Sequence, residues 1–188
     1  MRDTLTDSTL LVATTHLKAK ASPENEQIRI CQARQLVDGL SSLLSQSGSG
    51  GGAVKGPLSS KTYGAPHIVL TGDFNTTMDS EVCQILKSEG LASMWDGELI
   101  PESSLPAGGG GGAKGRPDEE FTTWKFRESN GCEAEVKRVI DYIWFSQGLN
   151  LMSRWAQLSE ADIGNTGLPS MTYPSDHIAI CCDLDLPQ

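Results

Sequence analysis

A carboxylate and a carboxamide, Asp73 and Asn75, stand one residue apart just after the apolar run at residues 67–70. If that run is a buried strand, its alternation directs both side chains to the same side. Two polar groups held there can bind a water molecule and an anionic oxygen. The alternative is a turn in which both side chains only satisfy nearby backbone amides.

Asp141 is a carboxylate inside the apolar segment 140–145. A carboxylate in such a strand loses its hydration, so it needs a histidine, an arginine or a metal ion as a partner. An ion pair with Lys137 or Arg138, which are close in the sequence, is the alternative without a chemical role.

Two histidines stand at the borders of apolar segments. His177 follows Ser175 and Asp176 just before an alternating segment, and His16 ends the run that begins at Leu10. A histidine can donate to a developing negative charge, and a carboxylate partner keeps the ring oriented and protonated. Taken singly, His177 also fits a surface histidine and His16 a cap on backbone groups.

Together these polar residues recur at strand ends or inside strands, which predicts one shared rim of the sheets. Carboxylates and an amide oxygen without cysteine ligands favour Mg²⁺ or Mn²⁺ over zinc. The candidate residues are His16, Asp73, Asn75, Asp141, Asp176 and His177.

The elements that must position these residues are about six strands and two sizeable helices. One helix begins at Ser22-Pro23-Glu24 and the other runs from about Asp79 to Gly90. Regular alternation of strands and helices fails, so we expect mixed or antiparallel sheets. Besides the strands ending near His16 and Asp73, strands are expected over 121–126, 139–145, 149–158 and 178–186.

The remaining composition narrows the class of partner. Glycine-rich stretches near 45–61 and 106–120 read as flexible surface insertions. The 15 basic and 24 acidic residues give a net charge of -9, which argues against duplex DNA as a partner. An anionic substrate must therefore meet a metal ion or a local basic cluster.

Targeting signals are not apparent in the sequence. No apolar run approaches the roughly 18 residues of a membrane span. The five cysteines show no CxxC spacing, and the first residues do not resemble a secretory signal. The cytoplasm is the default location on these grounds.

Five segments occur in one order: THLKAK, GDFN, TTWKFR, VIDYIWFS and YPSDH, at 15–20, 72–75, 122–127, 139–146 and 173–177. This set resembles the endonuclease/exonuclease/phosphatase superfamily, and within it the deadenylase-like branch, over residues 8–187. The resemblance implies an α/β fold, a four-layer sandwich of two packed mixed or antiparallel sheets flanked by helices, here incomplete at its N-terminus.

The resemblance also implies a role for each candidate. Asp73 would orient or deprotonate the attacking water, and Asn75 would bond the phosphoryl oxygens. His177 would stabilise the charge developing on phosphorus, with its ring fixed by Asp141. His16 would contact the phosphate. These five residues are the expected catalytic set.

A metal ion and substrate cations complete the implied site. Asp176 would lie near Mg²⁺ or Mn²⁺, whose principal glutamate ligand comes, in the superfamily, from a half that precedes the THL segment. Without that half we expect poor metal affinity, poor turnover and poor solubility. Basic residues at period-2 spacing would serve substrate phosphates if their segments are extended, the alternative being a solvated edge. They are Lys18, Lys20, Lys125 and Arg127.

Three functions remain open at this stage. The first, implied by the resemblance, is a Mg²⁺-dependent phosphoesterase that removes the 2′-phosphate of NADP(H). The second is a 3′-to-5′ exoribonuclease that shortens poly(A) RNA. The third is a non-catalytic nucleotide-binding module that lacks the metal-binding glutamate. The acidic net charge favours a small nucleotide as the substrate, because binding of a long RNA strand requires an extended basic or aromatic surface.

Overall fold

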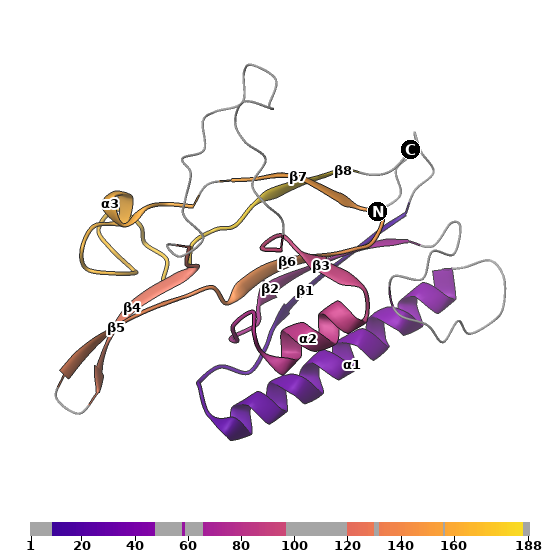
Figure 1. Ribbon diagram of the computed structural model, residues 1–188, viewed down its shortest axis with the longest axis horizontal. Helices are drawn as coiled ribbons and strands as arrows, with labels where there is room; N and C mark the ends of the chain where they lie inside the picture. Colours follow the sequence, from indigo (N-terminus) through magenta and orange to yellow (C-terminus); the bar gives the residue numbers. More distant parts are fainter. Residues whose placement is uncertain are drawn as a thin grey trace, which may run out of the picture.

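The computed structural model describes residues 9–47, 58, 66–96, 120–129, 132–155 and 157–185. These residues form a mixed α/β fold, which confirms the expected fold class. Figure 1 shows a central sheet with helices on one side and a two-stranded ribbon on the other.

The central sheet has the strand order β1-β2-β6-β3. β1 (Leu10–His16) is parallel to β2 (His67–Asp73), and β2 is antiparallel to β6 (Asp141–Ser146). β3 (Leu91–Ser93) completes the sheet beside β6. The last row of the ladders pairs His16 with Asp73 and Asp73 with Asp141. Three candidate residues therefore lie side by side at one end of the sheet.

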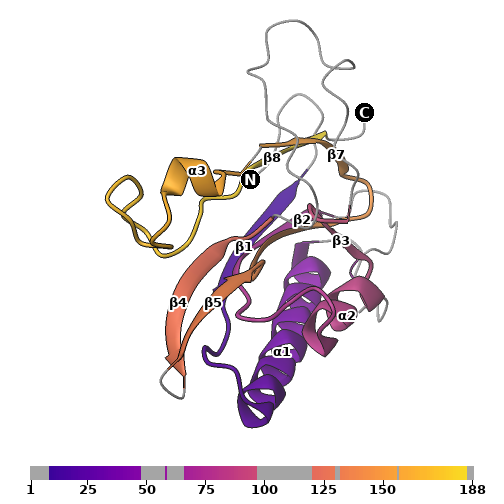
Figure 2. The same ribbon diagram turned by 60° about the vertical axis from the view of Figure 1, so that its left-hand side comes forward.

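Two helices cover one face of this sheet, as Figures 1 and 2 show. α1 (Pro23–Ser47) follows the predicted cap, since the Ser22 hydroxyl accepts from the Asn25 amide at 3.1 Å. α2 (Glu81–Ser88) begins after Ser80, close to the predicted Asp79. The core between helices and sheet consists mainly of apolar side chains, and it also contains the Tyr142 hydroxyl and the Trp144 indole nitrogen. It includes Ile30, Ala33, Val37, Leu40, Ile68, Leu70, Val82, Leu86, Tyr142 and Trp144.

The other strands form two separate pairs. β4 (Thr123–Ser129) and β5 (Cys132–Arg138) make an antiparallel hairpin. β7 (Asn150–Arg154) pairs with β8 (Cys182–Asp185) on the side of the central sheet away from the helices. A short helix, α3 (Glu160–Ile163), precedes the loop that leads to β8.

Several predicted boundaries were wrong for identifiable reasons. β5 was missed because its residues are mostly charged, and β7 ends at Arg154 instead of 158. The alternation that begins at Ile178 becomes strand only from Cys182. Ile178 is instead drawn into a second core with Phe121, Trp124, Ile163 and Leu168.

Two further expectations fall partly on described residues. α1 reaches Ser47, so the first residues of the expected 45–61 insertion are helical, and Leu58 is buried. The rest of that stretch, and 106–119, lie outside the described residues. Among the described residues, no helix is long and apolar enough to cross a membrane, and Cys31, Cys83, Cys181 and Cys182 are free thiols.

Gly72 permits the close approach of β1 to β2. Its φ is +142°, and a Cβ added there would lie 1.8 Å from the backbone oxygen of Thr15. We expect Gly72→Ala to lower the free energy of unfolding by at least about 1–3 kcal/mol, measured by urea denaturation. The control is Gly39→Ala in α1, where nothing lies within 4 Å and alanine should stabilise by roughly 0.5–1 kcal/mol. Equal effects of the two changes would contradict this account.

Candidate active site

The end of the central sheet brings four predicted residues together, and two histidine rings face one carboxylate oxygen of Asp73. His16 Nε2 lies 3.4 Å and His177 Nε2 3.8 Å from Asp73 Oδ2. The other ring nitrogen of His177, Nδ1, lies 2.8 Å from Asp141 Oδ2. Asp73 is positioned by β2, Asp141 by β6 and His16 by β1, whereas His177 comes from the loop before β8.

Asp73 and Asn75 are close for a reason that strand alternation did not predict. β2 ends at Asp73, Phe74 enters the core, and Asn75 has a left-handed φ of +52°. Asparagine tolerates that conformation. The Asn75 amide donates to Asp73 Oδ1 at 2.8 Å, and its Nδ2 donates to Asp73 Oδ2 and Leu17 O, both at 3.1 Å. A turn does follow Asp73, and its hydrogen bonds hold the Asp73 carboxylate.

Asp141 takes a histidine as its partner, not the neighbouring cations. Lys137 pairs with Glu135 at 2.8 Å and with Glu160. Burial raises the pKa of the Asp141 carboxyl, and hydrogen bonds from Thr122 and His177 offset this only in part, while nearby Asp73 adds to the rise. A carboxylate that holds its proton strongly makes a strong hydrogen bond to the imidazole.

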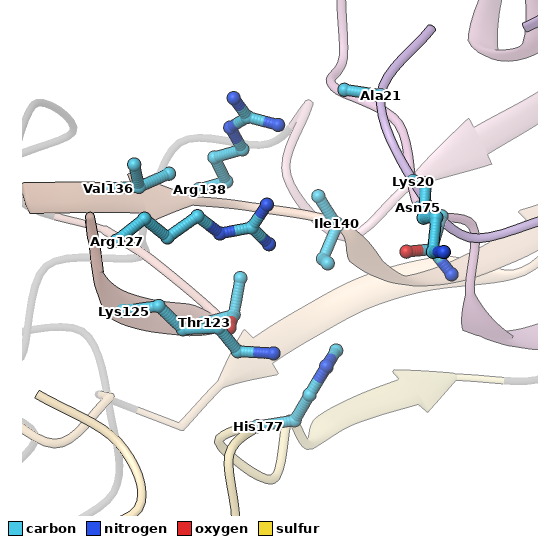
Figure 3. Close-up of a pocket in the computed structure, with 10 residues that line it drawn as sticks. All are labelled: Lys20, Ala21, Asn75, Thr123, Lys125, Arg127, Val136, Arg138, Ile140 and His177. Atoms are coloured by element: carbon cyan, nitrogen blue, oxygen red, sulfur yellow. The ribbon is translucent and has the colours of Figure 1, made fainter. Parts of the chain in front are cut away.

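A hollow of about 70 Å³ opens beside these groups and carries four cationic side chains. Figure 3 shows Lys125 and Arg127 extending from the β4–β5 hairpin toward the side where Asn75 and His177 lie. The cations that line it are Lys20, Lys125, Arg127 and Arg138. An acidic protein thus offers concentrated positive charge at one place, which suits a small anion.

The two pairs of basic residues that were expected to bind substrate phosphates differ in their positions. Lys125 and Arg127 lie on β4 and share the hollow, as an extended segment predicts. Trp124 and Phe126 alternate with them and line a groove beside α3. Lys18 and Lys20 follow the end of β1, and Lys20 has a φ of +73°, so that segment is not extended. Of that second pair only Lys20 lines the hollow.

Asp176 points to a cation and not to the central carboxylates. Its Oδ2 lies 2.8 Å from Lys125 Nζ, and this hydrogen bond lowers the pKa of Asp176. Its assignment as a metal ligand remains a prediction.

A metal ion could be held by a different group. Atoms of Asp73, Asp141 and His177 lie within 4.8 Å of one another. Mg²⁺ is commonly bound by one or two carboxylates, with water and substrate phosphate completing the shell. The two carboxylates fit that demand. The ring of His177 could also act as a ligand through Nε2 while Nδ1 keeps its hydrogen bond to Asp141. Oxygen ligation suits this site better, because Mg²⁺ prefers oxygen ligands.

Sequence reasoning missed two residues that the structure places at the site. Arg138 was considered only as a partner of Asp141, yet it lines the hollow. Thr122 is fully buried, and its hydroxyl accepts from the Asp141 amide at 3.2 Å. The signal for Arg138 lay in strand β5, whose pairing with β4 was not foreseen. Thr122 gave no signal in the sequence beyond its place in the TTWKFR segment.

Comparison with known proteins identifies the family of this chain. The model of the endonuclease/exonuclease/phosphatase family matches residues 43–177. Nocturnin of Homo sapiens is 30% identical over 179 residues, which cover 94% of this chain and 33% of nocturnin. A probable CCR4-Not complex 3′-5′-exoribonuclease subunit Ccr4 of Enterocytozoon bieneusi is 32% identical over 123 residues, 63% of this chain and 24% of that protein.

A solved structure agrees with these matches. The human nocturnin catalytic domain with bound sulfate superposes with a TM-score of 0.58 and 25% identity, covering 99% of this chain and 50% of that domain. The chain thus spans about a third of the length of nocturnin and half of its catalytic domain.

The raised pKa of Asp141 makes a prediction about stability and pH. The folded state binds this proton more tightly than the unfolded state, so Asp141 adds stability below its ordinary pKa of about 3.9 and loses it as the pH rises. The free energy of unfolding of Asp141→Asn, relative to wild type, should therefore rise from about pH 4 upward. Urea titrations over a pH series measure this difference.

Asp79→Asn is the matched control for that experiment. A hydrogen bond from Thr77 lowers the pKa of Asp79, so its contribution has the opposite sign and is lost as the pH falls. Its difference from wild type should become more negative as the pH rises. If both variants moved in the same direction, the assignment for Asp141 would be wrong.

The basic hollow predicts binding of an anion such as pyrophosphate, followed by calorimetry. Arg138→Ala should weaken pyrophosphate binding roughly 10-fold, because a charged hydrogen bond is lost, and added salt should weaken it further. Asp176→Asn should strengthen it by releasing Lys125. Lys87→Ala is the control, since Lys87 pairs with Asp96 away from the hollow. Equal losses from Arg138→Ala and Lys87→Ala would rule out a specific site.

Proposed function

The chain belongs to the endonuclease/exonuclease/phosphatase family. We propose that it forms part of a metal-dependent phosphoesterase that removes the 2′-phosphate of NADP(H). One observation carries the proposal: two imidazole Nε2 atoms converge on Asp73 Oδ2 beside a hollow with four cationic side chains. A carboxylate that can act as a general base and several cationic groups are thereby concentrated at one place.

The proposed reaction is attack of water on phosphorus, which forms a new P–O bond and breaks the bond between phosphorus and the ribose 2′-oxygen. The 2′-oxygen leaves with the electron pair of that bond and takes a proton from solvent water. Asp73 accepts the proton of the attacking water, and the turn at Asn75 holds the carboxylate in place. Asp141 binds Nδ1 of His177, which leaves Nε2 free to donate to the phosphoryl oxygen as its charge grows. His16 reaches the same region from β1 and contacts the phosphate.

Magnesium or manganese fits the carboxylates of this site. Asp73 and Asp141 would hold it, with Asp176 as the weaker candidate because Lys125 occupies its carboxylate. When bound, the metal acts as a Lewis acid on a phosphoryl oxygen.

The lining of the hollow favours a compact nucleotide over RNA. NADP(H) carries a pyrophosphate in addition to its 2′-phosphate, and Lys20, Lys125, Arg127 and Arg138 could bind that second anionic group. Single-stranded RNA is usually bound by aromatic side chains on which bases stack. The described residues that line the hollow include no Phe, Tyr or Trp. Poly(A) shortening remains the second candidate, supported by the similarity to the probable exoribonuclease subunit.

Asp73→Ala tests this assignment most directly. Phosphate release from NADP(H) and shortening of an oligo(A) strand are measured with Mg²⁺, in the chain and in a form extended at its N-terminus by the preceding half of a nocturnin catalytic domain. Turnover of NADP(H) by the extended form should fall at least about 10³-fold in the variant, because the general base is lost. The fold should be kept, as the far-ultraviolet circular dichroism spectrum can verify.

The control variant is Asp79→Ala, which removes an exposed carboxylate outside the site. It should leave turnover unchanged. Activity that survives Asp73→Ala with unaltered metal dependence would refute the role of Asp73. Activity on oligo(A) alone would favour the exoribonuclease, and phosphate-dependent binding without turnover in either form would favour the non-catalytic module.

A further inference from the structure

Thr122 lies between the two segments that carry Asp141 and His177. It is fully buried, and it directly precedes β4. Its backbone amide donates to Arg138 O at 2.9 Å, which continues the β4–β5 pairing by one residue. From this position its side chain and its carbonyl point to different parts of the chain.

The hydroxyl of Thr122 binds the backbone where the chain runs from β5 to β6. It accepts from the amides of Ile140 at 3.0 Å and Asp141 at 3.2 Å. Residues 139 and 140 belong to no strand, so sheet pairing does not satisfy the Ile140 amide. A hydroxyl oxygen has two lone pairs, and here both are used. The hydroxyl oxygen also lies 3.4 Å from Arg138 O.

The carbonyl of Thr122 holds the other partner. It accepts from the Ile178 amide at 2.8 Å, one residue beyond His177. The next residue reinforces the contact, because the Thr123 hydroxyl donates to Asp176 O at 3.0 Å. The loop that carries His177 is thus fastened to the start of β4 on both sides of the histidine.

We propose that Thr122 is the positioning residue for the Asp141–His177 pair, fixing Asp141 through its hydroxyl and His177 through its carbonyl. This inference rests on the proposed function, since it assigns Thr122 a role in the same site. The 2.8 Å bond between Asp141 and His177 joins segments 36 residues apart. One residue that binds both backbones sets that distance, which supporting groups of an active site must do within fractions of an ångström.

A purely structural role makes a different prediction. If Thr122 only fills space, valine, which keeps its shape, should serve as well as threonine, whereas serine should leave a cavity. If the hydroxyl positions Asp141, serine should serve and valine should not, since two buried amides would lose their acceptor. The pair Thr122→Val and Thr122→Ser therefore separates the two roles.

The first readout does not depend on turnover. The chain has only three histidines, His16, His67 and His177, so the ring N–H signals of ¹⁵N-histidine-labelled protein can be assigned with His177→Gln. The wild type should show a slowly exchanging Nδ1–H of His177, bonded to Asp141. Thr122→Val should lose this signal. Thr122→Ser should keep it, and so should the control Thr71→Val, which removes a hydroxyl bonded only to Ala13 O at 3.5 Å.

The second readout is turnover of NADP(H) by the extended form. Thr122→Val should lower kcat about 10- to 100-fold, as loss of supporting groups does in metal sites, without raising KM, because no cation of the hollow is altered. Retained Nδ1–H and kcat in Thr122→Val would overturn the proposal, as would equal damage from serine. Should the valine variant not fold, Thr122→Cys, with its weak acceptor, replaces it.

The two proposals fail in different ways. If the wild-type protein shows no turnover, and the Nδ1–H signal of His177 is lost only in Thr122→Val, the positioning role stands and the proposed function falls. If the wild type is active and Thr122→Val is equally active, the function stands and the positioning role falls.

Discussion

The arrangement of the site depends on how β2 pairs at its final residue. β2 has a neighbour on each side, and Asp73 ends both ladders, parallel to β1 and antiparallel to β6. His16 and Asp141 therefore arrive beside Asp73 as a consequence of register. Gly72 makes this possible, because a side chain there would collide with the β1 backbone. The helices secure the register from below by burying Ile68 and Leu70, the inward residues of β2.

Charge is distributed in two layers around this row. Carboxylates and imidazoles occupy the sheet end, and cationic side chains stand across the hollow on β4, β5 and the loop after β1. Arg29, buried beneath that loop, donates to the backbone oxygens of Lys18 and Lys20 and is paired with Glu26. The loop thus owes its shape to a helix residue, while Lys125 has Asp176 as an internal partner that an incoming anion must displace.

Much of this could be predicted from the sequence, and the remainder was hidden for physical reasons. Apolar runs and caps located α1, α2 and the strands that carry Asp73 and Asp141, because burial dominates those segments. β5 was not predicted as a strand, because a hairpin strand with few buried residues shows little alternation of apolar side chains. Arg138 was not predicted as a site residue because it lies on β5. Thr122 was not predicted because its role depends on hydrogen bonds to the backbone, which the pattern of residue types does not reveal. Lys18 is not among the residues that line the hollow, and the left-handed φ of Lys20 shows that the segment after His16 is not a continuous strand.

The alternation along β4 has a consequence for how the hairpin can vary. Lys125 and Arg127 face the hollow, while Trp124 and Phe126 face the groove beside α3. Inserting or deleting a single residue between 123 and 127 would exchange these faces, burying two cations against the second core and presenting aromatic rings to the anion. A single inserted residue in this strand would therefore need a β-bulge to keep the two faces as they are. Paired insertions would preserve the faces and extend the hollow.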